Sequence, residues 1–181
     1  MTDQQQNQKA MFEAGIDRDC YDRNIGFGPL GEGGKTAYNW LMTQASQDIT
    51  DGKGVAVVGK NANAYLGFHL IARGLLLGFH QNVRVLSMPR LVDFLEAKEA
   101  YEALAELDCL FIEGFYSDHY KTGPAPYNNE KISQLEWLFQ WFTKKGGRLF
   151  LLTTDPLINC HWWTPLFIAR LQRKTMEITV L

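Results

Sequence analysis

Several features of secreted, membrane-bound or DNA-coating proteins are missing from this sequence. Its three cysteines, Cys20, Cys109 and Cys160, are an odd and scattered set, which indicates a reducing compartment and no disulfide framework. No apolar run approaches the roughly 20 residues of a membrane span, and the polar start lacks a signal-peptide core. The net charge of −2 gives no overall basic field for DNA. We therefore expect a cytoplasmic protein without membrane contact.

The sequence also lacks the spacings that are typical of metal sites. It contains no CxxC and no HxxxH pattern. Cys160–His161 and Asp118–His119 supply suitable side chains, but two neighbouring pairs far apart in the sequence do not define a zinc site. We expect no bound metal, and core or surface packing for these residues.

The composition is that of a folded protein. The chain has 181 residues, of which 46% are hydrophobic and 13% aromatic, enough to bury one core. Residues 1–10 are rich in glutamine, so we expect a frayed, disordered N-terminus there. Residues 11–181 are expected to form a single domain.

Apolar segments of two kinds alternate along the chain and predict an α/β fold with a parallel sheet. Short apolar runs predict strands at 55–58, 82–86, 110–112, 148–153 and 176–181. Three- and four-residue periodicity predicts helices at 35–49, 64–77, 89–94, 98–106, 131–144 and 165–173. Ligands of such sheets bind at the carboxyl ends of the strands.

One strand, loop and helix has the outline of a nucleotide site. Residues 54–66 read GVAVVGKNANAYL. A phosphate-binding P-loop has glycines whose N–H groups wrap the phosphates, then Lys for the phosphates and Ser or Thr for Mg²⁺. Tyr65 and Leu66 hold those last two places, and alanines replace two glycines, whereas Gly59 and Lys60 remain. The outline is present without its chemistry.

Together with three further segments, this stretch resembles the ATPase core of DnaC/DnaI-type helicase loaders and the related IstB-like transposition ATPases, of the AAA+ class. The resemblance runs from about Phe12 onward. LDCLFIEGF is similar to the Walker B strand, LFLLTTD to the sensor-1 strand, and FIARLQRKTMEITVL to the segment that carries the arginine finger. It implies a three-layer αβα P-loop NTPase-like (AAA+/RecA-like) core with a mainly parallel sheet. No C-terminal lid is expected, because the sequence stops at Leu181.

Departures from the family pattern bear on activity. The Walker B strand of the family ends in Asp-Glu for Mg²⁺ and the attacking water, whereas the matching positions here are Glu113 and Gly114. Thr154 follows the sensor-1 strand, and Arg170 matches the arginine finger. The loss of the Lys, the hydroxyl and the catalytic Glu would leave the transferred phosphoryl group without stabilisation. The resemblance thus implies a degenerate nucleotide site that uses neither ATP nor Mg²⁺.

From this resemblance we expect a non-catalytic, loader-like pseudo-ATPase in DNA replication. Its partner would be a replicative helicase or an AAA+ loader, with Arg170 directed into a neighbour's site and at most weak contact with single-stranded DNA. A phage or mobile-element source would suit such a protein. Trp162 and Trp163 have two open interpretations: a buried anchor beside the last helix, or an exposed contact for a partner.

Two alternatives remain open. Residues 28–36 read GPLGEGGKT and resemble a P-loop, but the glycine spacing is one residue too long and no apolar strand precedes them. With this segment or Lys60 as an unorthodox phosphate loop, the chain would be an active helicase loader that binds ATP and Mg²⁺. The second alternative is a structural subunit that keeps only the fold.

Overall fold

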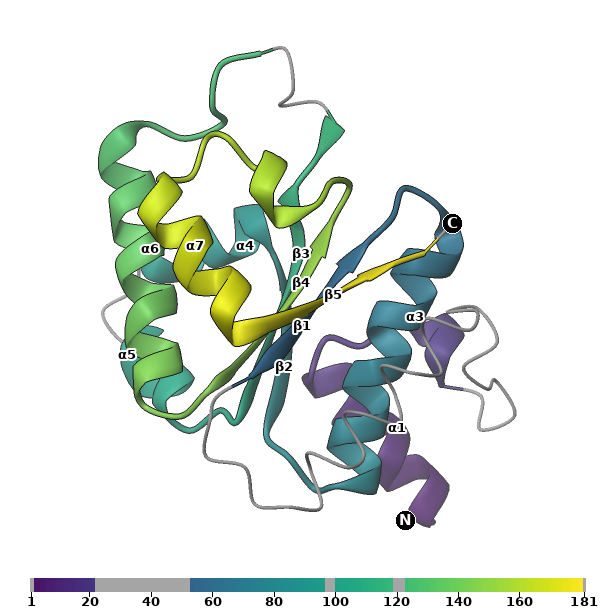
Figure 1. The fold of residues 1–181 in the computed structure, drawn as a ribbon. Helices are drawn as coiled ribbons and strands as arrows, with labels where there is room; N and C mark the ends of the chain where they lie inside the picture. Colours follow the sequence, from purple (N-terminus) through teal and green to yellow (C-terminus); the bar gives the residue numbers. More distant parts are fainter. Residues whose placement is uncertain (1, 22–52, 97–99, 119–122, 181) are drawn as a thin grey trace.

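The computed structural model describes residues 2–21, 53–96, 100–118 and 123–180. In these ranges the chain forms a five-stranded sheet, and every strand pair is parallel. The order is β2-β3-β4-β1-β5 (Figure 1). The strands are β1 (Gly54–Val58), β2 (Val83–Ser87), β3 (Cys109–Tyr116), β4 (Arg148–Thr153) and β5 (Thr175–Thr179). The predicted parallel α/β sheet is confirmed.

Helices cover both faces of this sheet and give three layers. α1 and α3 pack on one face, and α4, α5, α6 and α7 on the other (Figure 1). The α-helices are α1 (Asp3–Glu13), α3 (Ala62–Arg73), α4 (Met88–Leu95), α5 (Ala100–Ala105), α6 (Asn129–Lys144) and α7 (Pro165–Lys174). Short 3₁₀ turns, η1 (Arg18–Cys20) and η5 (Leu157–Asn159), and a π turn, η3 (Gly74–Gly78), complete the described elements. The helix expected at 35–49 and the glycine-rich residues 28–36 lie outside the described residues.

Alternating side chains of the central strand β1 serve both layers. Val55 and Val57 join the core under α1 and α3, whereas Ala56 faces the core under α6 and α7. All five residues of β1 are buried, because β4 and β5 flank the strand and helices cover both of its faces. The continuous apolar run therefore marked a doubly covered strand correctly.

The N-terminal segment differs from the expectation of a frayed end, because α1 begins at Asp3. Thr2 accepts a hydrogen bond from the Gln5 N–H, and the Gln5 side chain accepts one from the Thr2 N–H. Met11 on the same helix is buried in the core. Glutamine is also a good helix former, so a glutamine-rich segment with a cap and an apolar anchor can be helical.

β3 is longer than predicted and contains an irregularity. Its pairing with β4 shifts register between Ile112 and Tyr116, and Gly114 within this bulge has a φ of 66°. Glycine adopts this left-handed conformation without the strain that other residues incur. The bulge interrupts the alternation of side chains after Glu113 and lets the strand continue through Phe115 and Tyr116.

A buried carboxylate holds α7 against α6. Glu136 on α6 accepts hydrogen bonds from the N–H (2.7 Å) and the hydroxyl (2.9 Å) of Thr164, the N-cap of α7. We expect Glu136→Ala to lower the free energy of unfolding by about 1–3 kcal/mol, because two hydrogen bonds to a buried carboxylate are lost. Urea unfolding measures this loss, with exposed Glu106→Ala as the control. Equal stability of the two variants would show that the hydrogen bonds of Glu136 to Thr164 do not stabilise the fold.

The three cysteines are free and buried. Burial raises the pKa of each thiol, Cys20, Cys109 and Cys160, to about 12. Because the thiolate is the reactive form, we expect no reaction of the native protein with a thiol reagent such as DTNB at pH 8. Three thiols should react once urea unfolds the chain. Rapid titration of a thiol in the native state would contradict this.

Candidate functional site

Five of the predicted nucleotide-site residues meet at the carboxyl ends of β1, β3 and β4. A hollow of about 180 Å³ is lined there by residues of the loop after β1, the bulge of β3 and the end of β4. Among the predicted residues, its lining includes Gly59, Lys60, Tyr65, Gly114 and Thr154. A second hollow, of about 340 Å³, lies across the same loop toward β5. The first volume falls below, and the second near the lower end of, the ~300–1,000 Å³ range of small-molecule sites.

The loop between β1 and α3 is short and folded back on its surroundings. α3 begins at Ala62 with Asn61 as its N-cap, and the Asn61 Oδ1 atom accepts the Ala64 N–H at 2.9 Å. A Cβ atom at Gly59 would lie 2.6 Å from the Ala64 Cβ and 3.0 Å from the Val180 carbonyl oxygen. The loop therefore lies tightly against α3 and β5, and the helix cap already uses the Ala64 N–H.

The lysine of this loop is neutralised from across the hollow. The ammonium group of Lys60 forms an ion pair with the carboxylate of Asp118, just beyond β3. Both side chains are partly exposed, so water screens the pair and a competing anion could reach it. In this structure, however, the charge of Lys60 is directed to a carboxylate of the same chain.

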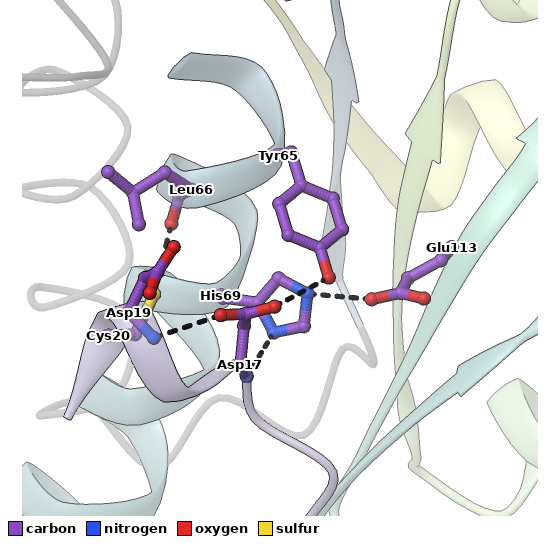
Figure 2. A network of polar contacts seen from close by, with 7 residues as sticks. All are labelled: Asp17, Asp19, Cys20, Tyr65, Leu66, His69 and Glu113. Carbon is purple, nitrogen blue, oxygen red and sulfur yellow. Dashed lines mark hydrogen bonds and ion pairs between the residues drawn. The ribbon is translucent and has the colours of Figure 1, made fainter. Parts of the chain in front are cut away.

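Tyr65, which the resemblance places where a P-loop has its lysine, points from α3 into a polar network (Figure 2). Its hydroxyl donates to the Asp17 carboxylate at 3.0 Å, and its ring lies 4.6 Å from that of His69 (Figure 2). Burial raises the pKa of Tyr65 above its usual value, and the negative charge of Glu113 raises it further. The phenol therefore stays protonated and acts as a donor. Because this aromatic side chain carries no positive charge, it cannot contact phosphate as lysine does.

His69 is hydrogen-bonded to the carboxylate of Glu113. Its Nδ1 atom accepts the Asp17 N–H at 3.1 Å, and its Nε2 atom lies 2.6 Å from the Glu113 carboxylate (Figure 2). Since Nδ1 accepts an N–H, the ring proton is on Nε2 and is donated to Glu113. The side chain that would hold Mg²⁺ by resemblance is thus bound to a buried histidine. Sequence reasoning missed His69, although it lies one helical turn from Tyr65.

The segment at residues 17–21 is fastened along α3 by further contacts. The Cys20 thiol donates to the Leu66 carbonyl at 3.7 Å, and Arg73 donates to the Cys20 carbonyl at 2.8 Å. The Asp19 N–H donates to the Asp17 carboxylate, which lowers the pKa of that carboxyl. The Leu66 side chain is half-buried against the core of α1 and α3. Leu66 therefore contributes packing and no hydroxyl.

The two tryptophans are not a surface for partners. Trp162 and Trp163 are buried, their rings stack at 4.3 Å, and Trp163 also stacks on Phe115 at 4.7 Å. The interpretation of these residues as an exposed partner contact is wrong, and that of a buried anchor beside α7 is correct. Among the tryptophans that the structure describes, the exposed one is Trp137 on α6.

Thr154 and Arg170 have different surroundings. Thr154 lines both hollows, and its hydroxyl donates to Asp155 at 3.2 Å. Arg170 lies on the exposed side of α7, where its guanidinium donates to the Gln140 side chain on α6. It lines neither hollow beside Gly59. The structure thus places Arg170 apart from the predicted residues around Gly59.

The described residues show neither a metal cluster nor a membrane segment. Over 2–21, 53–96, 100–118 and 123–180, no three His, Cys, Asp or Glu side chains lie close enough to hold a metal ion. Within these same ranges no helix has the length and apolar character that crossing a bilayer requires.

Comparison of the sequence with protein-family models and with curated proteins finds no match. Solved structures do match. A protein from Streptococcus pyogenes described as a primosome component has a TM-score of 0.65 at 13% identity, with 96% of each chain covered. DnaI has a TM-score of 0.61 at 13% identity over 87% of this chain and 95% of that one. AMPPCP-bound DnaA from Aquifex aeolicus has a TM-score of 0.62 at 11% identity, over 82% of this chain and 47% of that one.

The chain has the fold of the AAA+ P-loop NTPase core. The sheet order β2-β3-β4-β1-β5 matches that core. The structural likeness is to replication initiation proteins, at identities that establish the fold alone.

Proposed function

We propose that this chain is a non-catalytic AAA+-like protein of DNA replication that binds a replicative helicase or an AAA+ loader ATPase. One observation carries the proposal: the side chains at the positions that the resemblance assigns to phosphate and Mg²⁺ are each bound to another side chain of this chain. Tyr65 binds Asp17, His69 binds Glu113, and Lys60 pairs with Asp118. Polar contacts of the chain itself therefore engage the side chains that would have to meet a nucleotide.

Phosphoryl transfer depends on groups that are positioned beforehand. In P-loop NTPases the Lys, the Mg²⁺ and a water-positioning residue stabilise the charge on the transferred group. In this chain, nucleotide binding would have to break the Lys60–Asp118 pair. Recruitment of Mg²⁺ to Glu113 would also leave buried His69 without its acceptor. Gly114 carries no side chain to orient water.

A loader-like fold without catalysis can still act through its surface. Arg170 is exposed, hydrogen-bonds to the neutral Gln140 amide, and pairs with no carboxylate in the part of the chain that the structure describes. Its charge is thus available to a partner. We propose that it contacts anionic groups of the docked protein, in the manner of an arginine finger supplied to a neighbour. Contact with single-stranded DNA would be secondary and weak.

Binding and ATPase assays with the replicative helicase and loader of the source organism test this proposal. We expect the chain to co-elute with one of them in gel filtration and to change its ATP turnover. Arg170→Ala should remove the effect on turnover without loss of folding, whereas Arg84→Ala, an exposed cation on the edge strand β2, should leave it unchanged. Absence of binding to both proteins would favour the structural-subunit alternative.

A further inference from the structure

α6 and α7 lie across the sheet from α3, the helix that carries Tyr65 and His69 (Figure 1). Residues of α6 and α7 line a groove. It encloses about 560 Å³, within the ~300–1,000 Å³ range of ligand sites. Its floor is apolar and includes Phe139, Phe167 and Leu171. Among the residues that the structure describes, its lining contains four cationic side chains and no carboxylate, although the whole chain has a net charge of −2. Positive charge is therefore concentrated at this groove.

The two helices run parallel, so their side chains can be matched level by level. Thr164 at the start of α7 contacts Glu136, and Arg170 contacts Gln140 one turn further along α6. Near the first level, Trp137 and Leu166 are large and exposed, at 57% and 63%, and lie beside the groove without lining it. The Trp137 ring also packs edge-on against Tyr101 of α5. Near the far end, the cations line the groove: Lys144, Arg173 and Lys174.

The outer face of α7 likewise has an apolar residue near its start and cations near its end. Leu166, Arg170 and Arg173 are spaced i, i+4 and i+7 and share one face of the helix. At ~1.5 Å per residue, about 10 Å separates the apolar end from the basic end. The surface thus offers an apolar contact and, one to two helical turns away, positive charge above an apolar floor.

We propose that this groove binds an acidic amphipathic segment of a partner protein. The segment would place Leu, Phe or Trp side chains against Trp137 and Leu166, and carboxylates about seven helical positions away against Arg170, Arg173 and Lys144. The inference deepens the proposed function, on which it rests, by naming the chemistry of the partner's contact segment. Charge complementarity and the apolar contact select this occupant.

The groove suits a peptide better than a nucleic acid. Single-stranded nucleic acids bind through successive aromatic side chains that are open to base stacking. The Phe139 and Phe167 rings are buried and stack on each other, with centroids 6.0 Å apart. The floor therefore offers no open ring face to a base, whereas an aliphatic or aromatic side chain of a peptide can pack against its apolar atoms.

The test uses a phage-displayed library of random 12-residue peptides, panned against the full chain. We expect the enriched peptides to combine an apolar residue with Asp or Glu four and seven positions away, in either direction. A fluorescein-labelled copy of the most enriched peptide then measures affinity by anisotropy. Absence of enrichment, or enrichment without acidic residues, overturns the proposal.

Matched variants locate the peptide. Arg170→Glu/Arg173→Glu should weaken binding at least about tenfold, as should Trp137→Ser/Leu166→Ser, because both ends of the groove contribute. Arg84→Glu/Arg90→Glu, the same charge change on β2 and α4, should alter affinity less than about twofold. If a reversal variant fails to show wild-type thermal unfolding, Arg170→Gln/Arg173→Gln replaces it. Undiminished binding by the folded groove variant overturns the proposal.

A fluorescein-labelled dT20 oligonucleotide gives the remaining comparison. We expect it to bind more weakly than the peptide and not to displace it, and tighter, competitive binding would make the groove a nucleic-acid site instead. The library contains neither helicase nor loader. If no peptide binds the groove but the chain co-elutes with the helicase or loader, only the groove proposal fails. If acidic peptides bind the groove but neither protein co-elutes, only the proposed replication partner fails.

Discussion

Gly54→Ala is expected to prevent stable folding of this chain. A Cβ atom at Gly54 would lie 1.6 Å from the carbonyl oxygen of Leu149 on the neighbouring strand β4. β1 is hydrogen-bonded to β4 on one side and to β5 on the other, so it cannot move away without breaking one of the ladders. We expect a loss of about 3 kcal/mol or more in the free energy of unfolding, a large part of the stability of a typical domain.

Gly78→Ala is the matched control for this prediction. A Cβ atom at Gly78 meets nothing within 4 Å, and no positive φ is recorded there. This variant should stay within about 0.5 kcal/mol of the wild type. Urea unfolding followed by circular dichroism measures both. A Gly54→Ala protein as stable as Gly78→Ala would show that β1 and β4 are not paired as described.

His69→Leu is expected to have the second large effect. The substitution keeps the size of the side chain but leaves the Asp17 N–H and the Glu113 carboxylate without their partner. His69 is 1% exposed, so water cannot simply replace the ring. Because each unsatisfied group costs about 1–3 kcal/mol, we expect a total loss of about 2–4 kcal/mol.

Tyr65→Phe probes the same network at its exposed edge and serves as the control. It removes only the hydrogen bond to Asp17 and should cost less than about 1 kcal/mol. Thermal and urea unfolding of both variants give the comparison. If His69→Leu proves as stable as the wild type, the network does not hold residues 17–21 against α3.

The regular part of the fold could be predicted from local pattern. β4 has the bounds expected, 148–153, because a short apolar run marks a buried strand. α6 follows from apolar residues at helical spacing, and its predicted start differs from Asn129 by two residues. The bulge of β3 could not be predicted, since a register shift depends on the neighbouring strand. Trp162 and Trp163 lie outside any periodic element, so their burial could not be settled from the sequence.

The location of the candidate site could be predicted from the sequence, but the contacts between its side chains could not. Tyr65, Leu66 and Gly114 could be singled out from the sequence because they depart from the pattern of the family that the sequence resembles. The polar contacts within the site join residues far apart in the sequence. His69 lies 44 positions from Glu113 and 52 positions from Asp17. Only the folded chain brings these groups together, and no local signal distinguishes His69 from a core histidine.

Isothermal titration of the purified chain with ATP and Mg²⁺ at 25 °C tests the central claim most directly. The account predicts no saturable binding with a Kd below about 1 mM, because Tyr65, Glu113 and Lys60 are committed to contacts within the chain. One-to-one binding in the low micromolar range would contradict it. Loss of that binding in Lys60→Ala would assign the nucleotide to the loop after β1, and loss in Lys35→Ala would assign it to residues 28–36.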